Sequence, residues 1–316
     1  MMNDTRRETV MICHSLRYRA KHTILDTMKN ALTIDLEEYF QVHALSDIVP
    51  VNSWDSFSCE APDNTKKILD VLDESGVSAT FFCLGWNAQR NPKLIESIHD
   101  RGHEVACHGH MHQLISTQDP KVFREDVSRA KKTLEDSTGE EVIGYRAPTY
   151  SITNKTLWAF DILEELGFRY DSSIFPIYHD NYGIPDAPRF PYRIPGRSLA
   201  EFPISTMKLG AFNFPVAGGG YFRLFPYLLT RSALKHLEKS GNPFIFYIHP
   251  WEVNSRTPRV EGISALSRFR TYVGLAAAYG KFCNLLKDFE FTTARDVLRE
   301  LGFLDPEDLS TVRPGA

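Results

Sequence analysis

The sequence predicts an α/β fold, and the simplest arrangement that fits it is a parallel β/α barrel, irregular or incomplete. After Asn30, short apolar runs rich in β-branched residues alternate with longer segments of helical periodicity. Most of the helical segments close on a glycine, which is the residue preferred at a helix C-terminus. No low-complexity linker interrupts the alternation, so the repeated units are expected to form one domain.

The expected elements follow in chain order. Short apolar segments predict strands at 31–35, 77–85, 103–109, 141–148, 168–175, 243–251 and 289–293. Apolar residues at helical spacing predict helices at 64–76, 91–102, 122–139, 154–167 and 229–241, a long helix within 266–289, and a last helix at 294–302. Residues 174–226 are rich in proline, glycine and tyrosine, and they predict long ordered loops.

The two ends of the chain lack this rhythm. We expect a loosely held extension over residues 1–29 and a tail over 305–316, on either side of a domain at 30–304. Met28 stands just before the first strand and is a candidate start of translation. The acidic residues of the extension argue against a mitochondrial presequence.

The composition excludes several classes of protein. Lysine and arginine number 36 against 40 acidic residues, so no global positive charge would draw the chain to nucleic acid or to an anionic membrane. No apolar run approaches the ~20 residues that cross a bilayer, and the start of the chain lacks the ~7 to 15 apolar residues of a signal peptide. A cytoplasmic location is therefore expected. The five cysteines form no CxxC pair, which favours reduced thiols.

Ionisable side chains end five of the expected strands. Because the C-terminal ends of barrel strands meet on one face, these side chains are expected to converge. They are Asp35 with Glu37 after the first strand, then His108, Arg146, Asp171 and His249 after four later ones.

Four of the 11 histidines fall in the stretch GHEVACHGHMH. An extended strand would separate His108 and His112 by ~13 Å, so the chain must turn if they share an ion. A helical turn beginning at His108 would place both on one face, and Gly109 makes such a bend easy. His110 is then the reserve ligand. The alternative is a polar loop that carries solvated histidines.

Asp35 and Glu37 lie two residues apart, so on an extended chain they face the same side while Glu38 faces away. One carboxylate with two neutral imidazoles is a common ligand set for zinc or a similar divalent ion, and it leaves positions open for water and substrate. The second carboxylate could then act as a base. A helix cap or a surface salt bridge is the alternative for either acid.

Five segments in this order, TIDLEEYF, HGHMH, GYRAPTY, YDSSIFP and YIHPWE, resemble the signature segments of the polysaccharide deacetylases with the NodB-homology fold. The segments AGGGYFRLFPY, HPWEVNSRTPRV and SRFRTY are similar to the branch linked to exosortase and exopolysaccharide loci. The likeness runs from about Asn30 to Thr293. It implies an irregular β/α barrel with about seven parallel strands, a catalytic domain at 30–304, and a family-specific C-terminal part from about residue 175.

The resemblance also implies a role for each residue at the strand ends. It implies a metal triad of Glu37, His108 and His112, a catalytic base Asp35 paired with Arg146, a general acid His249 tuned by Asp171, and an oxyanion donor in the N–H of Thr149. One divalent ion, zinc above all, would activate a bound water that attacks an N-acetyl amide.

Two departures from the usual motifs bear on these roles. Leu36 separates the two acids that are commonly adjacent, and the longer arm of glutamate leaves Glu38 a rival of Glu37 as ligand. Thr149 replaces the usual aromatic residue of the third motif, with Tyr150 one place later. The backbone N–H of Thr149 could still bind an oxyanion.

The resemblance implies that the substrate is an N-acetylated polysaccharide or oligosaccharide and that the reaction belongs to exopolysaccharide biosynthesis. It also implies a membrane-bound polysaccharide assembly as a partner, which would place the protein at the periphery of the inner membrane. Sugar rings stack on aromatic faces, and Tyr150, Trp251 and Tyr221 are the candidates on the expected rim, where Tyr39, Phe40 and Phe222 are also expected. Two other functions stay open. The same machinery could cleave a small cyclic amide or ureide, or the chain could bind glycans without catalysis.

Overall fold

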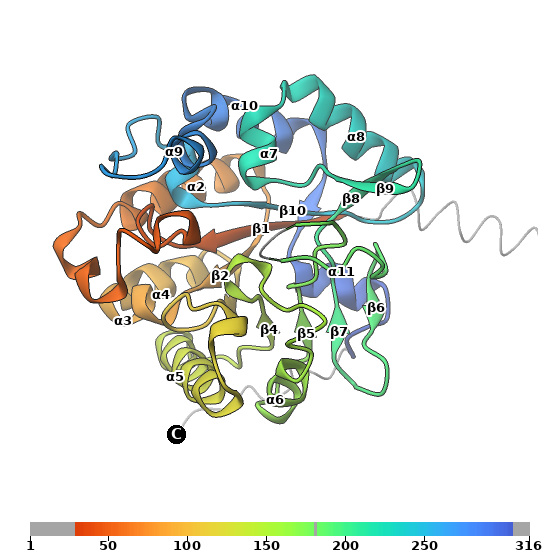
Figure 1. Cartoon of the computed structure of the whole chain (residues 1–316). Helices are drawn as coiled ribbons and strands as arrows, with labels where there is room; N and C mark the ends of the chain where they lie inside the picture. Colours follow the sequence, from red (N-terminus) through yellow and green to blue (C-terminus); the bar gives the residue numbers. More distant parts are fainter. Residues whose placement is uncertain (1–28, 180–181, 306–316) are drawn as a thin grey trace, which may run out of the picture.

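The computed structural model of the chain describes residues 29–179 and 182–305. The expected extension and the candidate start at Met28 lie outside the described residues, except for Lys29, and so does the expected tail, except for Asp305. Within the described part, strands and helices alternate along the chain, and Figure 1 shows the helices arranged around a curved sheet.

A nine-stranded sheet forms the centre of the described chain. Along the sheet the strands follow the order β10 (Ile245–Ile248), β1 (Asn30–Leu36), β2 (Thr80–Cys83), β3 (Glu104–Cys107), β4 (Gly144–Tyr145), β5 (Tyr170–Asp171), β7 (Ala200–Glu201) and β6 (Tyr192–Arg193). A further strand, β11 (Phe291–Thr292), pairs with the start of β1. Every pairing in this sheet is parallel except that of β6 with β7. Seven strands from β10 to β7 are thus parallel neighbours, which confirms the expected irregular barrel of about seven parallel strands.

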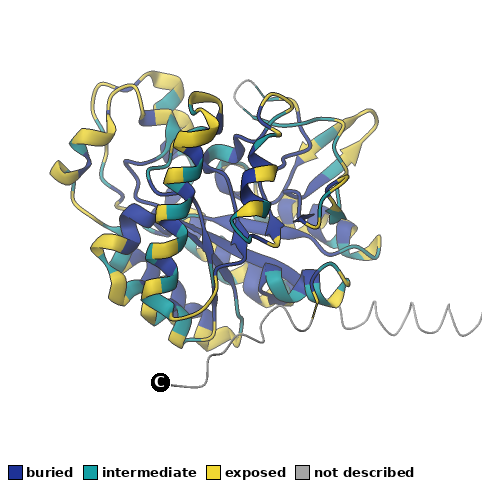
Figure 2. Cartoon of the chain, turned by 90° about the horizontal axis from the view of Figure 1, so that it is seen from below, coloured by how far each residue is buried: buried dark blue, intermediate teal, exposed yellow. Residues whose placement is uncertain are grey.

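The helices of the described chain lie around the sheet, as Figure 1 shows. They are α2 (Ala61–Ser75), α3 (Gly85–Arg90), α4 (Pro92–Asp100), α5 (Pro120–Thr138), α6 (Ala159–Glu165), α7 (Gly219–Leu224), α8 (Tyr227–Lys239), α9 (Ala265–Tyr272), α10 (Leu275–Asp288) and α11 (Ala294–Glu300). Figure 2 shows buried strands and helices whose outer faces are exposed. None of the helices in the described ranges is long and apolar enough to cross a membrane.

Helix α5 illustrates how the local sequence forms these elements. Its N-cap, Asp119, accepts hydrogen bonds from two backbone N–H groups of the first turn, and Pro120 occupies the first helical position. The helix ends at Gly139, which has a φ of 73° and forms a left-handed cap. Between these ends it buries one apolar stripe against the sheet, made of Phe123, Val127, Ala130 and Leu134.

The barrel is closed by irregular chain and not by strand pairing. Strands β10 and β7 lie at opposite ends of the run of parallel strands and do not pair. Ser205 Oγ accepts a hydrogen bond from the N–H of Ile245 (2.9 Å), and Ala217 O accepts one from the N–H of Tyr247 (3.0 Å). The segments after β7 and before α7 therefore satisfy the outer edge of β10.

The structure corrects several expected elements. The stretch 174–226 contains β6, β7, a hairpin of β8 (Thr206–Leu209) with β9 (Phe212–Pro215), and α7, where only loops were expected. The long helix expected within 266–289 is two helices, because the backbone leaves the helical conformation at Val273 and Gly274 starts α10 in the left-handed region with a φ of 70°. The short helix α3 was not expected.

Candidate active site

Strand β1 carries the two acids to the C-terminal edge of the sheet. Asp35 lies within the strand and Glu37 follows its last residue, and both are buried, with 2% and 3% of their surface exposed. Leu36 between them is part of the apolar core, as the alternation of an extended strand requires. The two carboxylates therefore project to the same side, as expected.

The loop after β3 brings His108 and His112 together. The chain turns at Gly109, which has a φ of 75°, and His112 itself adopts a φ of 51°. The Asp126 side chain on α5 holds this loop, because it accepts hydrogen bonds from the N–H of His110 (2.7 Å) and of Met111 (3.2 Å). The turn is thus an irregular bend anchored from α5, and the expected helical turn is wrong.

Glu37, His108 and His112 form a group that could hold a metal ion. One ligand atom from each lies within 4.8 Å of the others. The Nε2 atoms of His108 and His112 lie 3.6 and 3.3 Å from the Glu37 oxygens. His108 Nδ1 is 2.8 Å from Arg146 O, so it donates there and leaves Nε2 free as a ligand.

The residues of this group fit a divalent cation. Three of their buried atoms, Glu37 Oε2, His108 Nε2 and His112 Nε2, have no hydrogen-bond partner among the described residues. Buried polar atoms without partners are costly, and a shared cation would satisfy all three. Two imidazoles and one carboxylate are a donor set typical of zinc and related ions. Burial acts to raise the pKa of Glu37, but the His112 and His249 charges outweigh it and lower the pKa well below its usual value.

Glu38 points away from this group. Its two oxygens accept hydrogen bonds from the N–H of Glu60 and of Ala61, both 2.9 Å, at the start of α2. Burial raises the pKa of Glu38 to about 7, although these two bonds act in the opposite direction. Glu37 is therefore the acid beside the imidazoles, and Glu38 holds the N-terminus of a helix.

Asp35 is held by a fully buried arginine. Arg146 Nη1 lies 2.6 Å from Asp35 Oδ1 and also donates to Thr33 Oγ1 at 2.8 Å. Its other nitrogens donate to Ser172 O (3.1 Å) and Ser172 Oγ (2.9 Å), and the guanidinium lies over the ring of Phe82. Both charges of the pair are thus compensated within the core, and one oxygen of Asp35 is oriented by strands β4 and β5.

The segment after β4 contributes Thr149 and Tyr150. The Tyr150 hydroxyl donates to Asp35 Oδ2 at 3.3 Å, and only 7% of this residue is exposed. Both residues have left-handed backbone, with φ of 56° and 53°, a conformation that costs non-glycine residues about 1 to 3 kcal/mol and clusters at functional sites. The N–H of Thr149 has no acceptor among the residues that the structure describes.

His249 follows β10 and faces both acids of β1. Its Nε2 lies 3.2 Å from Glu37 Oε1 and 4.0 Å from Asp35 Oδ2. Its Nδ1 lies 3.1 Å from Glu252 Oε2, and Arg223 Nε lies 2.6 Å from the other oxygen of Glu252. Burial would lower the pKa of His249, but the charges of Glu252 and Glu37 raise it well above its usual value. Burial would raise the pKa of Glu252, but Arg223 and His249 hold it at about 2.

Asp171 does not contact His249, which corrects its expected role as the carboxylate that tunes the acid. Its oxygens accept hydrogen bonds from Ser173 N (2.9 Å) and Ser173 Oγ (2.6 Å), and Glu201 is its neighbour across the β5–β7 pairing. Asp171 and Glu201 are fully buried. Burial, together with the Asp171 charge, raises the pKa of Glu201 well above its usual value. Glu252 is the carboxylate that contacts His249 in place of Asp171. The sequence signal for Glu252 is its position three residues after His249 in HPWE, a spacing typical of a capping box.

The expected rim of aromatic residues is largely core. Tyr39, Phe40 and Trp251 belong to one buried aromatic cluster, and Phe222 is 2% exposed. Trp251 stacks on His249 with ring centroids 5.4 Å apart. Tyr221 alone of the three candidate sugar platforms is partly exposed.

The other two histidines of the rich stretch are buried away from the group. His103 Nδ1 accepts a hydrogen bond from the N–H of Ala79 at 3.2 Å, and the ring of His110 lies against Gly85. Burial lowers the pKa of each to about 4, so both are neutral core histidines near neutral pH. The expectation of His110 as a reserve ligand is therefore wrong.

Comparison with known proteins gives matches to both halves of the described chain. Residues 50–170 match the family model for polysaccharide deacetylases, and residues 172–299 match a domain of unknown function, DUF3473. The first match includes His108, His112 and Arg146 and begins after Asp35 and Glu37. The chain therefore contains a polysaccharide deacetylase domain.

Among curated proteins, the peptidoglycan deacetylase-like protein FGM2 of Gibberella zeae is 32% identical over 110 residues, which are 34% of this chain and 32% of that protein. A peptidoglycan-N-acetylglucosamine deacetylase of Bacillus cereus is 30% identical over 108 residues, 34% of this chain and 49% of that protein. The chain thus spans a third to a half of these relatives. A crystal structure of a putative polysaccharide deacetylase from Mycobacterium smegmatis has a TM-score of 0.56 at 20% identity, with 91% of this chain and 96% of that chain covered, which shows the shared fold.

Proposed function

We propose that the protein is a metal-dependent hydrolase that removes N-acetyl groups from a polysaccharide or oligosaccharide. The observation that carries the proposal is the placement of Asp35 beside the group Glu37, His108 and His112. The Nε2 atom of His249 faces the carboxylates of both Asp35 and Glu37. A base, a cation site and an acid within one buried cluster are the parts that amide hydrolysis needs.

The cation site is proposed to consist of Glu37, His108 and His112. When bound, a divalent ion would polarise the amide carbonyl and make a water easier to deprotonate at neutral pH. The chain holds these ligands from two sides, through β1 and through the loop anchored by Asp126. Zinc is the ion that this donor set favours.

Asp35 is proposed to accept the proton of the attacking water. Arg146 and Tyr150 fix its two oxygens, so the carboxylate needs no reorganisation when the proton arrives. A base in such a position contributes a factor of about 10² to 10⁴ to the rate.

His249 is proposed to donate a proton to the leaving amine. Its Nδ1 is engaged by Glu252, so Nε2 is the atom that faces the reaction site. The N–H of Thr149 would stabilise the oxyanion, an interaction whose loss costs a factor of about 10² to 10³. In the described chain His249 Nε2 lies 3.2 Å from Glu37 Oε1, whereas the N–H of Thr149 has no acceptor.

The substrate class rests on resemblance and on the relatives. Two relatives bear names that include peptidoglycan, which supports an N-acetylated amino sugar as the unit attacked. The similarity of AGGGYFRLFPY and HPWEVNSRTPRV to the exosortase-linked branch supports an exopolysaccharide as the polymer and a role in its biosynthesis. A cytoplasmic location and a membrane-bound polysaccharide assembly as partner belong to the same proposal.

The test combines metal analysis with acetate release. The purified protein is expected to hold one divalent ion per chain and to release acetate from N-acetylated oligosaccharides, and a chelator should abolish the release. His108→Ala should lose the ion and the activity, whereas Asp35→Asn should keep the ion and lose about 10² or more of the rate. A panel of acetylated glycans identifies the polymer.

The same assay separates the alternatives. Release of product from a cyclic amide or ureide, with none from glycans, would replace the proposed substrate class. Binding of glycans by a chain that releases no acetate with any ion would show a non-catalytic glycan-binding protein and contradict the proposal.

A further inference from the structure

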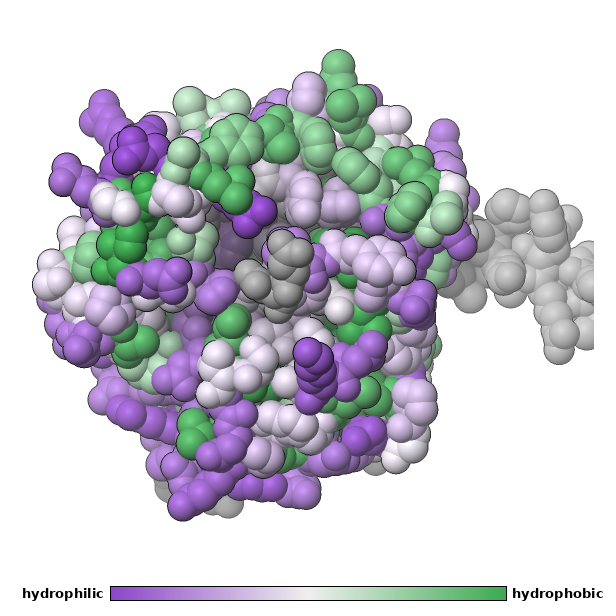
Figure 3. All heavy atoms as spheres, viewed as in Figure 1, coloured by the Kyte–Doolittle hydropathy of each residue, from purple (hydrophilic) through white to green (hydrophobic). Residues whose placement is uncertain are grey.

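Large apolar side chains are exposed together on one face of the molecule, far along the chain from the acids of β1. Figure 3 shows hydrophobic residues gathered over α7, α8 and the β8–β9 hairpin. We call this surface the apolar patch and define it by its exposed residues, Leu209, Phe212, Leu224, Leu228 and Leu229. Leu228 and Phe212 are 72% and 68% exposed, so water covers nearly whole side chains that would be more stable out of it.

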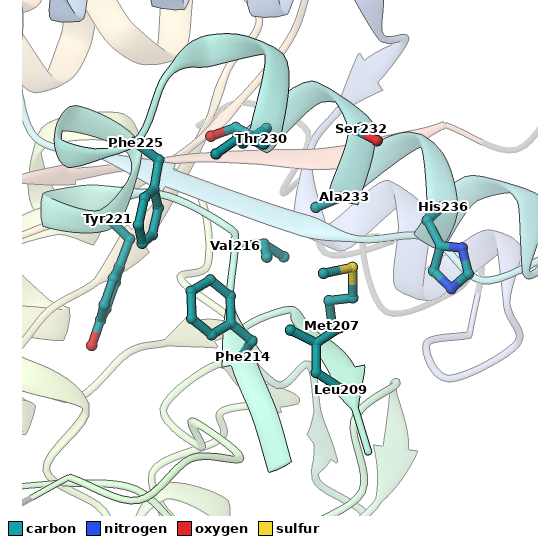
Figure 4. A pocket seen from close by; sticks show the side chains of 11 residues that line it. Met207, Leu209, Phe214, Val216, Tyr221, Phe225, Thr230, Ser232, Ala233 and His236 are labelled. Carbon is teal, nitrogen blue, oxygen red and sulfur yellow. The ribbon is translucent and has the colours of Figure 1, made fainter. Parts of the chain in front are cut away.

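The patch surrounds an apolar cavity of about 380 Å³ between the hairpin and the two helices. Figure 4 shows the side chains of Met207, Phe214 and Phe225 turned into it, with Val216 at its floor. Leu209 and Leu229 of the patch line the same cavity. An apolar surface of this extent, with a cavity beneath, is typical of a docking site and not of scattered surface residues.

The charge of this part of the chain is one-sided. Residues 202–237 contain no aspartate and no glutamate, although the whole chain carries a formal net charge of −4. The same residues include Lys208, Arg223, Arg231 and Lys235. Arg223 is buried against Glu252, which leaves three basic residues of the segment near the surface.

Basic and apolar side chains meet directly at α8. Leu228 lines a hollow together with Arg231, Lys235 and Lys239. Two acids pair with basic residues of this face, because Arg231 lies 3.0 Å from Asp288 and Lys235 lies 3.0 Å from Glu238 of the same helix. Lys208 and Lys239 are two further basic residues of the hairpin and of α8.

We propose that the apolar patch docks on the surface of an anionic lipid bilayer. Leucine and phenylalanine side chains at the hairpin tip and at the start of α8 would enter the boundary between headgroups and acyl chains, while the flanking lysines and arginines lie at the level of the phosphates. This mode of binding needs apolar and basic groups only at the contact itself. Negative charges of the chain that lie more than about a Debye length from the membrane are screened by salt, so the net negative charge does not prevent binding.

The test is sedimentation of the full chain with vesicles at about 0.1 M salt. Vesicles that contain phosphatidylglycerol are expected to bind the protein more tightly than vesicles of phosphatidylcholine alone. Leu228→Glu and Phe212→Glu should each weaken binding by about tenfold or more, since each removes a large side chain from the apolar interface. The matched control is Leu157→Glu, since Leu157 is 40% exposed and comes two residues before α6, which Figure 1 shows on the opposite side of the sheet from α8. It should leave binding within about twofold.

Three results would overturn the proposal. The first is a wild-type chain that does not sediment with either kind of vesicle. The second is a lack of selectivity, either for anionic over neutral vesicles or in the loss caused by the patch variants over that caused by Leu157→Glu. The third is a concentration-dependent dimer without vesicle binding, abolished by Leu228→Glu, which would show that a second copy of the chain covers the patch. Thermal unfolding of each variant checks that it is folded.

Discussion

Glu252 accepts hydrogen bonds from two parts of His249. One carboxylate oxygen, Oε2, lies 3.0 Å from the backbone nitrogen and 3.1 Å from Nδ1 of the same residue. The other oxygen is held by Arg223, whose remaining nitrogens donate to the backbone carbonyls of 270, 271 and 273. The orientation of the imidazole is therefore fixed by a buried ion pair, and through it by the C-terminal end of α9 and the residue that follows it.

Glu252→Gln is expected to lower kcat of the proposed deacetylase by about 10 to 10² while KM changes little, because the acid loses its orientation and not its contact with substrate. Glu252 raises the pKa of His249, so its neutralisation lowers that pKa. The protonated acid is then lost at lower pH, and the alkaline limb of the pH–rate profile moves to lower pH. Asp171→Asn is the control, and an equal movement of the limb in that variant would contradict the assignment.

The two neighbouring glutamates after β1 are expected to differ in metal binding. Glu37→Gln should lose most of the divalent ion, because a carboxylate ligand becomes a neutral amide. Glu38→Gln should keep the ion but lose about 1 kcal/mol of stability, since an amide can accept only one of the two N–H bonds at the start of α2. Metal content and urea unfolding are measured for both variants. If Glu38→Gln lost the ion and Glu37→Gln kept it, Glu38 would be the metal ligand and the assignment would be wrong.

Arg146 and Asp35 are expected to be coupled in stability. Arg146→Met should cost about 3 to 5 kcal/mol of unfolding free energy, because it leaves a buried carboxylate without its charge partner. Asp35→Asn in the same chain should restore part of the loss. Urea unfolding of the wild type, both single variants and the double variant, all with chelator, gives the coupling energy. Strictly additive losses would show that the pair does not interact.

The buried pair of Asp171 and Glu201 predicts a stability that depends on pH. A carboxyl group with a raised pKa in the folded state stabilises the fold below its ordinary pKa, and this contribution is lost as the pH rises toward the folded value. Glu201→Gln removes the titration and keeps an oxygen for the N–H of Ile174. The Tm of the variant minus the Tm of the wild type should therefore become more positive as the pH is raised from about 5 to about 8. A difference in Tm that is independent of pH would contradict this.

The strands were predictable where burial is complete on both faces. All seven residues of β1 are buried, including the polar Asn30, Thr33 and Asp35, and strands buried on both faces are typical of a parallel sheet covered by helices. Strands β6 and β7 were missed because they lie in the stretch 174–226, whose prolines and glycines indicate loops, whereas the equally short β4 and β5 lie in apolar segments. The split between α9 and α10 was missed because Val273 interrupts neither the hydropathy nor the charge pattern.

The site was predictable in its members but not in all of its contacts. Asp35, Glu37, His108 and His249 could be placed on one face because each ends a strand of a parallel sheet. Which acid orients His249 could not be read in the same way, since strand ends indicate a common face but not a neighbour. Likewise Tyr39, Phe40 and Trp251 look like surface aromatics in the sequence, and only the packing of the segments after β1 and β10 buries them.

The position of β1 also bears on how the chain can be made. This strand begins at Asn30, but one of its edges is completed by Ile245–Ile248 and its first residues pair with Phe291–Thr292. During synthesis the backbone groups on this edge of β1 have no strand partner until residues 245–248 and 291–292 have left the ribosome. A nascent or truncated chain that stops before Ile245 would therefore expose an apolar edge strand and depend on chaperones to avoid aggregation.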